Sequence, residues 1–93
     1  MELEKLLLEK LTGAKFKDFH VSMGITTTRR TQMFNRPGSM SLQEIGRLHS
    51  ILRPHKISYS LLINEYKCGY NTLTISEAEI LTSQDQVTDI IHQ

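Results

Sequence analysis

The sequence predicts a small all-α fold, a bundle of about five helices with a short helical C-terminal tail. Leucines between Leu3 and Leu11 recur at helical spacing, which predicts a helix over residues 2–11 that ends before Gly13. Ser41-Leu42-Gln43-Glu44 has the pattern of a capping box, and apolar residues recur after it at helical spacing as far as Leu52. Because Pro54 cannot continue a helix, the sequence predicts that this helix ends near residue 53.

Two shorter helices are expected between these elements. Phe16, Phe19, His20 and Met23 follow at steps of three and four residues, which predicts a second helix that ends at Gly24. Residues 26–32 hold no apolar side chain, and we interpret residues 27–35 as a mostly exposed helix capped by Thr26 or Thr27. A turn over residues 36–39 follows, since Pro37 bounds the helix before it.

The C-terminal third is less clearly patterned. Residues 56–75 fit both a strand and a helix, and Ser58 as a start with Gly69 as a stop favours the helix. Residues 70–75 are expected to be extended or loop. Possible capping boxes at residues 76–79 and 83–86 predict two short tail helices, over residues 76–82 and 84–92.

The charge is unevenly distributed along the chain. The 93 residues hold 11 Lys+Arg and 10 Asp+Glu, a net charge of +1. Residues 1–56 carry ten basic residues against five acidic ones, whereas residues 57–93 carry one against five. A basic front and an acidic tail predict an anionic partner for the front.

Composition also limits the function classes. A chain of this length forms one small core, too small for a large catalytic scaffold. The single Cys68 cannot form an internal disulfide, and the acidic start lacks the basic segment of a secretory signal, so a cytoplasmic protein is expected. No catalytic constellation, cofactor motif or membrane span is evident. The four histidines, His20, His49, His55 and His92, lack metal-ligand spacing with one another or with Cys68. The prediction is therefore a protein without enzymatic activity, cofactor or metal.

Two short helices around Met23-Gly24-Ile25 are typical of a helix-turn-helix, whose second helix lies in the DNA major groove. The helix after this turn is almost wholly polar and cationic at its front, which suits a helix that faces DNA. Residues 13–36 resemble the lambda-repressor-like (XRE/Cro-type) helix-turn-helix family, and the likeness extends over residues 3–67 through Leu6–Leu11, the turn at 35–39 and Ser41–Ile45. The family has a small residue where His20 stands, so His20 must tilt the helices apart or turn outward.

The resemblance implies sequence-specific binding of double-stranded DNA by a small phage- or prophage-type regulator that occupies an operator. It implies base contacts from the front of the second helix: Thr27, Thr28, Arg29, Thr31 and Gln32. Arg29 is either a guanine reader or a phosphate clamp. It implies phosphate contacts from Lys15, Lys17, Arg30, Asn35, Arg36 and Ser39.

On this interpretation residues 1–68 form the DNA-binding domain, and residues 69–93 form an extension. The apolar residues of the acidic C-terminal segment either supply a homodimer surface or complete the core. Useful specificity needs such a dimer, because one recognition helix contacts few bases. The alternative is a protein-interaction module, such as an antitoxin-like or mobile-element accessory factor, that uses the acidic C-terminal segment.

Overall fold

The computed structural model describes the backbone of residues 2–91 and the side chains of residues 2–85, and every element in this part is helical. The α-helices are α1 (Glu2–Lys10), α2 (Ala14–Lys17), α3 (Phe19–Met23), α4 (Thr27–Asn35), α5 (Leu42–Leu52) and α6 (Ile75–Ile91). The short elements are the 3₁₀-helices η1 (Pro37–Ser39) and η2 (Arg53–His55) and the π-helix η3 (Leu61–Glu65). The all-α prediction is confirmed for these residues.

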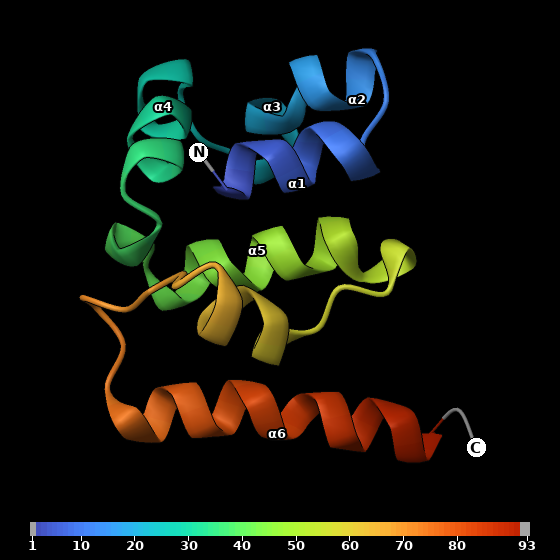
Figure 1. Cartoon of the computed structure of the whole chain (residues 1–93), viewed down its shortest axis with the longest axis vertical. Helices are drawn as coiled ribbons and strands as arrows, with labels where there is room; N and C mark the ends of the chain where they lie inside the picture. The colour runs from blue at the N-terminus through green and yellow to red at the C-terminus, as the bar shows by residue number, and fades with distance from the viewer. Residues whose placement is uncertain (1, 92–93) are drawn as a thin grey trace.

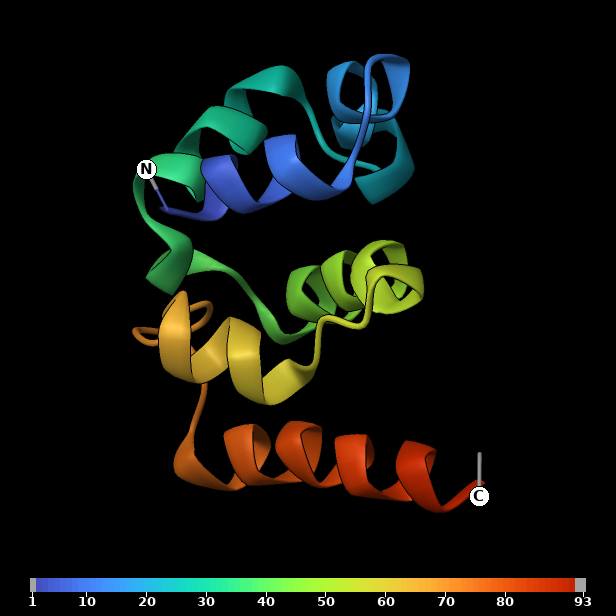
Figure 2. The ribbon, with the colours of Figure 1, turned by 45° about the vertical axis from the view of Figure 1, so that its right-hand side comes forward.

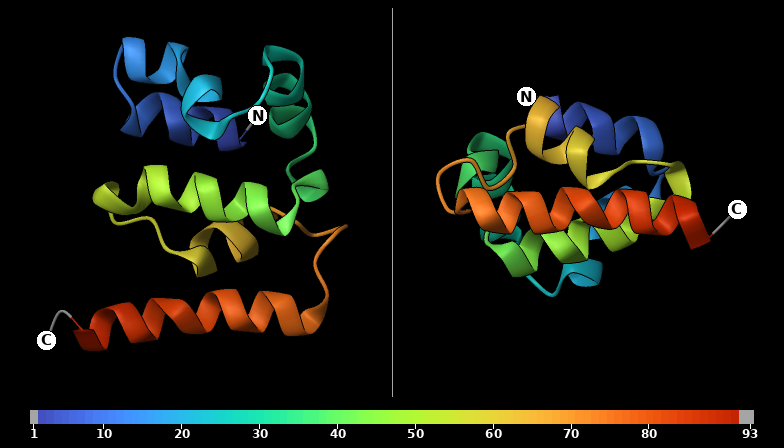
Figure 3. Two further views of the ribbon diagram at one scale, coloured as in Figure 1. Left: turned by 180° about the vertical axis from the view of Figure 1, so that it is seen from behind. Right: turned by 90° about the horizontal axis from the view of Figure 1, so that it is seen from below.

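The helices lie in three layers (Figure 1). Helices α1 to α4 form the first layer, α5 and η3 the middle one, and α6 lies alone on the far side from α1 (Figures 2 and 3). Helix α6 spans 17 residues, and within residues 2–91 no helix combines the length and apolar character needed to cross a membrane.

Helix α5 is the centre of the core. Its capping box is present as predicted: Glu44 N–H donates to Ser41 Oγ at 3.1 Å, and Ser41 N–H donates to Glu44 Oε1 at 2.9 Å. Ile45, Leu48 and Leu52 are fully buried, whereas Leu42, expected on the same apolar face, is 42% exposed at the first turn. Leu3, Leu6 and Leu7 of α1 and the methionines at 23, 33 and 40 fill the space around them.

The helix expected over residues 16–23 is interrupted. The structure divides it at Asp18 (φ −98°, ψ 14°) into α2 and α3. Phe16, before the break, and Phe19, after it, both stack on Phe34 of α4, with ring centroids 6.4 and 5.9 Å apart. These contacts join both short helices to α4, whereas the spacing alone predicts one continuous helix.

The turn between α3 and α4 follows the prediction closely. Gly24 adopts the left-handed conformation (φ 69°) that ends α3, because it has no side chain to clash there. Thr26 caps α4, since its Oγ1 accepts the N–H of Arg29 at 3.1 Å. His20 in α3 is half-buried, and its Nδ1 is buried without a hydrogen-bond partner among the described residues.

The ambiguous segment 56–75 is helical only in part, and its helix begins where Ser58 predicted. Ser58 Oγ accepts the N–H of Leu61 at 3.1 Å, and the helical segment ends at Glu65, before Gly69. Tyr59 is buried and stacks on His49 of α5, with ring centroids 3.8 Å apart. Residues 70–72 form a turn and residues 73–74 are irregular, as expected, whereas Ile75, expected in the same loop, already belongs to α6.

The segment after η3 returns to the end of α4. Gly69 N–H donates to the Pro37 carbonyl and Asn71 N–H donates to the Gly38 carbonyl, both at 3.0 Å. Thr72 Oγ1 donates to the carbonyl of Met40. These bonds fix η1, and with it the C-terminal end of α4, against the C-terminal part of the chain.

The prediction of two tail helices is wrong, because α6 is continuous from Ile75 to Ile91. Ser83 does not start a helix, since its hydroxyl donates to the Ile80 carbonyl at 2.8 Å within α6. The capping box also differs from the expected one: Thr74 and Glu77 exchange bonds of 2.9 and 3.1 Å at the start of α6. Residue 92, the predicted end of the second tail helix, lies outside the described residues.

Candidate functional site

Helix α4 presents a polar face to solvent. Thr27, Thr28, Thr31 and Gln32 are exposed, while the apolar residues Met33 and Phe34 at its C-terminal end are buried. The predicted base-contacting residues other than Arg29 therefore share one exposed helix. A face of this kind stabilises the fold little, because it buries almost no apolar area.

The hydroxyl of Thr31 is used inside α4. Thr31 Oγ1 donates to the Thr27 carbonyl at 3.2 Å, one turn earlier. Its proton is therefore committed to the backbone, and the hydroxyl oxygen remains an acceptor. The side chains of Thr27 and Thr28 are exposed at the N-terminal turn of the same helix.

Arg29 is held by a carboxylate of α5. Its Nε donates to Glu44 Oε2 at 2.8 Å, and its Nη2 donates to Glu44 Oε1 at 2.6 Å, the two-point geometry that suits a guanidinium and a carboxylate. The hydrogen bond from Arg29 lowers the pKa of the Glu44 carboxyl to about 2, and the same bond raises the pKa of Arg29. The pair is ionised and joins α4 to α5.

A shallow concavity of about 380 Å³ lies at the C-terminal end of α4. It is lined by Arg29, Gln32, Asn35, Arg36 and Ser39, all of which the sequence singles out as base or phosphate contacts. Ser39 Oγ donates to the Arg36 carbonyl at 2.7 Å, so an internal hydrogen bond stabilises the turn after α4. Since Glu44 balances Arg29, the net positive charge of this concavity comes from Arg36.

Arg30 points to the other side of α4. Its Nη1 donates to the Lys17 carbonyl at 3.0 Å, and its guanidinium lies 5.9 Å from the ring centroid of Phe16. Arg30 thus closes the C-terminal end of α2 against α4. Nothing in this geometry tests its predicted contact with phosphate.

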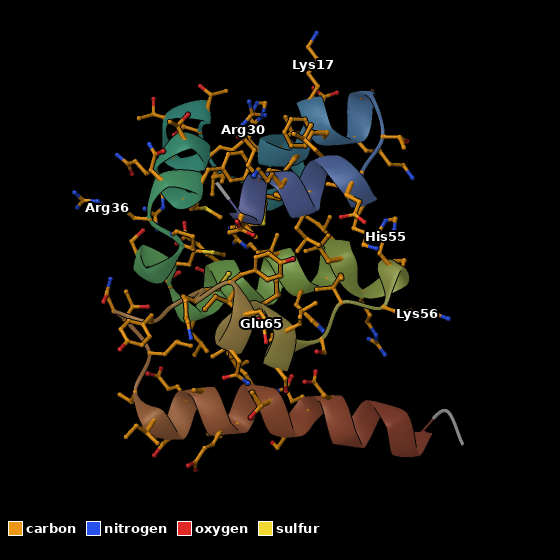
Figure 4. All side chains as sticks on the ribbon, in the orientation of Figure 1. Lys17, Arg30, Arg36, His55, Lys56 and Glu65 are labelled. Atoms are coloured by element: carbon orange, nitrogen blue, oxygen red, sulfur yellow. The ribbon has the colours of Figure 1, made fainter. Side chains whose placement is uncertain are left out.

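The predicted phosphate contacts do not all gather in one place. Figure 4 shows Lys17 and Arg36 pointing away from each other, one from α2 and one from the lower end of α4. Lys15 lines a second concavity, of about 430 Å³, together with Phe19 of α3 and His55 of η2. Only Asn35, Arg36 and Ser39, among the residues with that predicted role, share the concavity at α4.

Sequence reasoning missed two residues that hold the region together. Glu44 was predicted only as part of a capping box, and its pairing with Arg29 spans a separation of 15 residues that no local pattern reveals. Arg47 of α5 donates from Nη1 to the Met23 carbonyl at 3.1 Å, which satisfies the end of α3 beside the turn. No local pattern predicts this second contact, because its partners are 24 residues apart in the chain.

Metal binding and thiol chemistry would depend on the described His, Cys, Asp and Glu side chains. In the described part of the chain, no three His, Cys, Asp or Glu side chains are grouped so that they could hold a metal ion. His92 lies outside that part. Cys68 is fully buried, and burial raises the pKa of its thiol to about 12, so the thiolate needed for nucleophilic chemistry is scarce near neutral pH.

The fold and the site define the molecule as a small all-α protein with a polar, partly cationic helix on its surface. Comparison with models of protein families, with curated proteins and with solved structures gives no significant match.

Proposed function

We propose that this chain binds double-stranded DNA through α4 in a sequence-specific manner, as a small regulator of transcription that acts by occupying an operator. The observation that carries the proposal is the exposed polar face of α4, directly after the turn at Gly24 and beside the concavity at Arg36. A helix-turn-helix of the lambda-repressor-like type places its second helix in the major groove in this way.

Within this proposal the roles divide by side chain. Thr27, Thr28 and Gln32 read base edges, since hydroxyl and amide groups bond bases and the threonine methyl can contact a thymine methyl. Arg36, Asn35 and Ser39 hold the DNA backbone at the C-terminal end of α4, and Lys17 holds it from α2. Arg29 acts within the protein, because its Nε and Nη2 atoms already donate to the two carboxylate oxygens of Glu44.

A homodimer completes the proposal, because a single recognition helix reads too few base pairs for useful specificity. Helix α6 carries exposed apolar side chains for it: Ile75 and Ile80 are 81% and 60% exposed. A dimer of this kind would bind half-sites about one helical turn apart.

A protein partner on the surface of α6 is the second candidate function. The same exposed isoleucines lie on a helix with acidic residues, within the segment 57–93 that carries five acidic side chains. Sedimentation of the protein alone distinguishes the two roles for α6. A dimer supports the role in homodimerisation, and a monomer at every concentration favours the role in binding a protein partner.

The salt dependence of DNA binding tests the main proposal. A mixed-sequence duplex is titrated at several salt concentrations with the wild type, Arg36→Ala and Lys56→Ala. Lys56→Ala is the matched control, because Lys56 is exposed and lies on the opposite side of the molecule from Arg36 (Figure 4). Loss of one phosphate contact is expected to reduce the slope of log K against log salt by about one in Arg36→Ala.

Lys56→Ala is expected to keep the wild-type slope. Equal slopes for all three proteins would contradict the proposed docking, and the absence of salt-sensitive binding by the wild type would contradict DNA binding altogether. Selection from random duplexes with the wild type would then provide the operator sequence.

A further inference from the structure

The guanidinium of Arg29 connects Glu44 to Gln32. Of its donors, Nε and Nη2 are taken by Glu44, and Nη2 also donates to the Ser39 carbonyl at 3.0 Å. The remaining nitrogen, Nη1, lies 3.4 Å from Gln32 Oε1 and 3.4 Å from Ser39 Oγ. Arg29 therefore contacts Gln32 with the one part of its guanidinium that Glu44 leaves open.

A guanidinium has donors and no acceptor, so it can bond Gln32 only through the side-chain carbonyl oxygen. With its oxygen directed to Arg29, the amide of Gln32 has its NH₂ group left for another partner. The two-point contact of glutamine with adenine needs both the oxygen and the NH₂ group. The N7 and O6 atoms of guanine are both acceptors and need donors alone.

We infer that Glu44 and Arg29 are positioning residues that present Gln32 to DNA as a hydrogen-bond donor, so that Gln32 reads guanine in preference to adenine. This inference rests on the proposed function and assigns a base preference within it. It replaces the general expectation that a glutamine on a recognition helix reads adenine.

Glu44 is well suited to this role because it is itself fixed. Its carboxylate also accepts the N–H of Ser41 at 2.9 Å, in the capping box of α5. The side chains of Glu44 and Arg29 are 14% and 27% exposed, so the bond between them is partly shielded from water. The orientation of Gln32 thus follows from the start of α5.

The test uses Glu44→Gln, because glutamine also serves at the third position of a capping box and so preserves the start of α5. This substitution removes the carboxylate charge that holds Arg29. Asp18→Asn is the matched control: it removes one negative charge from an exposed residue that makes no side-chain cap bond between α2 and α3. Circular dichroism and thermal melting establish that both variants are folded.

Selection from random duplexes is carried out with the wild type, Gln32→Ala, Glu44→Gln and Asp18→Asn. The position whose base preference is lost in Gln32→Ala is the position that Gln32 reads. At that position the wild type and Asp18→Asn are expected to bind the guanine duplex about tenfold more tightly than the adenine duplex. Glu44→Gln is expected to bind the two duplexes with nearly equal affinity.

Removal of a negative charge raises affinity for both duplexes alike, so the guanine-to-adenine ratio separates positioning from simple electrostatics. A wild-type preference for adenine, or an unchanged ratio in Glu44→Gln, would overturn the inference while leaving DNA binding intact. If Gln32→Ala changes no position, Gln32 reads no base and the inference is likewise overturned. A wild type that binds no duplex would overturn both this inference and the proposed function.

Discussion

Glu44 and Arg29 form an ion pair between α4 and α5, and its effect on stability depends on pH. The pKa of Glu44 is about 2 in the folded protein, against an ordinary value of 4.5. A carboxylate with a lowered pKa stabilises the fold fully above its ordinary value, and this contribution is lost as the pH falls toward the folded value. The relevant window therefore lies between pH 4.5 and 2.

We predict that Glu44→Gln lowers the free energy of unfolding by about 2 kcal/mol at pH 7. The difference from the wild type should shrink as the pH falls through that window, since the wild type then loses the charge that the variant already lacks. Urea unfolding of both proteins at pH 7, 4 and 2.5 measures this. A difference that stays constant with pH would show that the charge of Glu44 contributes nothing.

The thiol of Cys68 should be unreactive in the folded protein. It is fully buried, and its pKa of about 12 leaves only a small fraction as thiolate at pH 8. We predict that a thiol reagent such as Ellman's reagent modifies Cys68 at least a hundredfold more slowly than it modifies the urea-unfolded chain, on the order expected for a core opening rarely. Rapid modification under native conditions would contradict the burial of this side chain.

Among the side chains described in α6, Leu81 and Asp85 contact the body of the molecule. Leu81 is buried, and Asp85 one turn later accepts the N–H groups of Tyr59 and Ser60, both at 3.0 Å, and the hydroxyl of Ser60 at 2.9 Å. A carboxylate that accepts N–H groups at the start of a helix stabilises it. Asp85 therefore caps the helix at residues 59–65 from another element.

We predict that Asp85→Ala lowers the free energy of unfolding by about 1–2 kcal/mol, the size of a lost helix cap. Hydrogen exchange of the amides of Tyr59 and Ser60 should accelerate more than that of amides in α1. Glu79→Ala is the control, since Glu79 is exposed on α6 and its carboxylate makes no bond among the described contacts. Equal losses in the two variants would argue against the cap.

The loop that precedes α6 depends on Gly69. Its φ is +75°, and a Cβ there would lie 2.5 Å from Ile45 Cδ1 and 2.8 Å from Leu73 Cγ. Gly69→Ala is predicted to lower the free energy of unfolding by about 2 kcal/mol or more, from backbone strain together with overpacking. The measurement is chemical denaturation, with Gly46→Ala as the comparison.

Gly46 lies inside α5, where a Cβ would have Tyr59 Oη as its nearest neighbour at 4.0 Å. Because glycine weakens a helix interior relative to alanine, Gly46→Ala should be stabilising, by about 0.5–1 kcal/mol. Opposite signs for the two glycines are expected. A stabilising effect of Gly69→Ala would refute the packing described around it.

Local signals in the sequence predicted the elements that have explicit start and stop residues. The capping box at Ser41, the cap at Thr26 and the turn at Gly24 act over a few residues, and each prediction is confirmed. The predictions of helix boundaries fail where the sequence has no such local signal or a misleading one. Asp18 divides the helix expected over residues 16–23, and Ser83, expected to start a helix, bonds within the continuous α6.

The sequence predicted an uneven distribution of charge along the chain, and the structure shows on which sides of the molecule the acidic and basic residues lie. The acidic helix α6 lies on the far side from the first layer, which holds Lys17, Arg30 and Arg36 (Figures 1 and 4). The candidate site could be predicted as a list of residues on α4. Its internal organisation could not, because the pairing of Arg29 with Glu44 joins two helices across a turn of the chain.

The cap that Asp85 provides also has a consequence for the order in which the chain is made. During synthesis the segment at residues 59–65 emerges before α6, and at that stage its first amides have no carboxylate to accept them. A helix that short is unstable without such support. The helix around residue 60 therefore becomes stable only after a side chain 25 residues later in the chain has been synthesised.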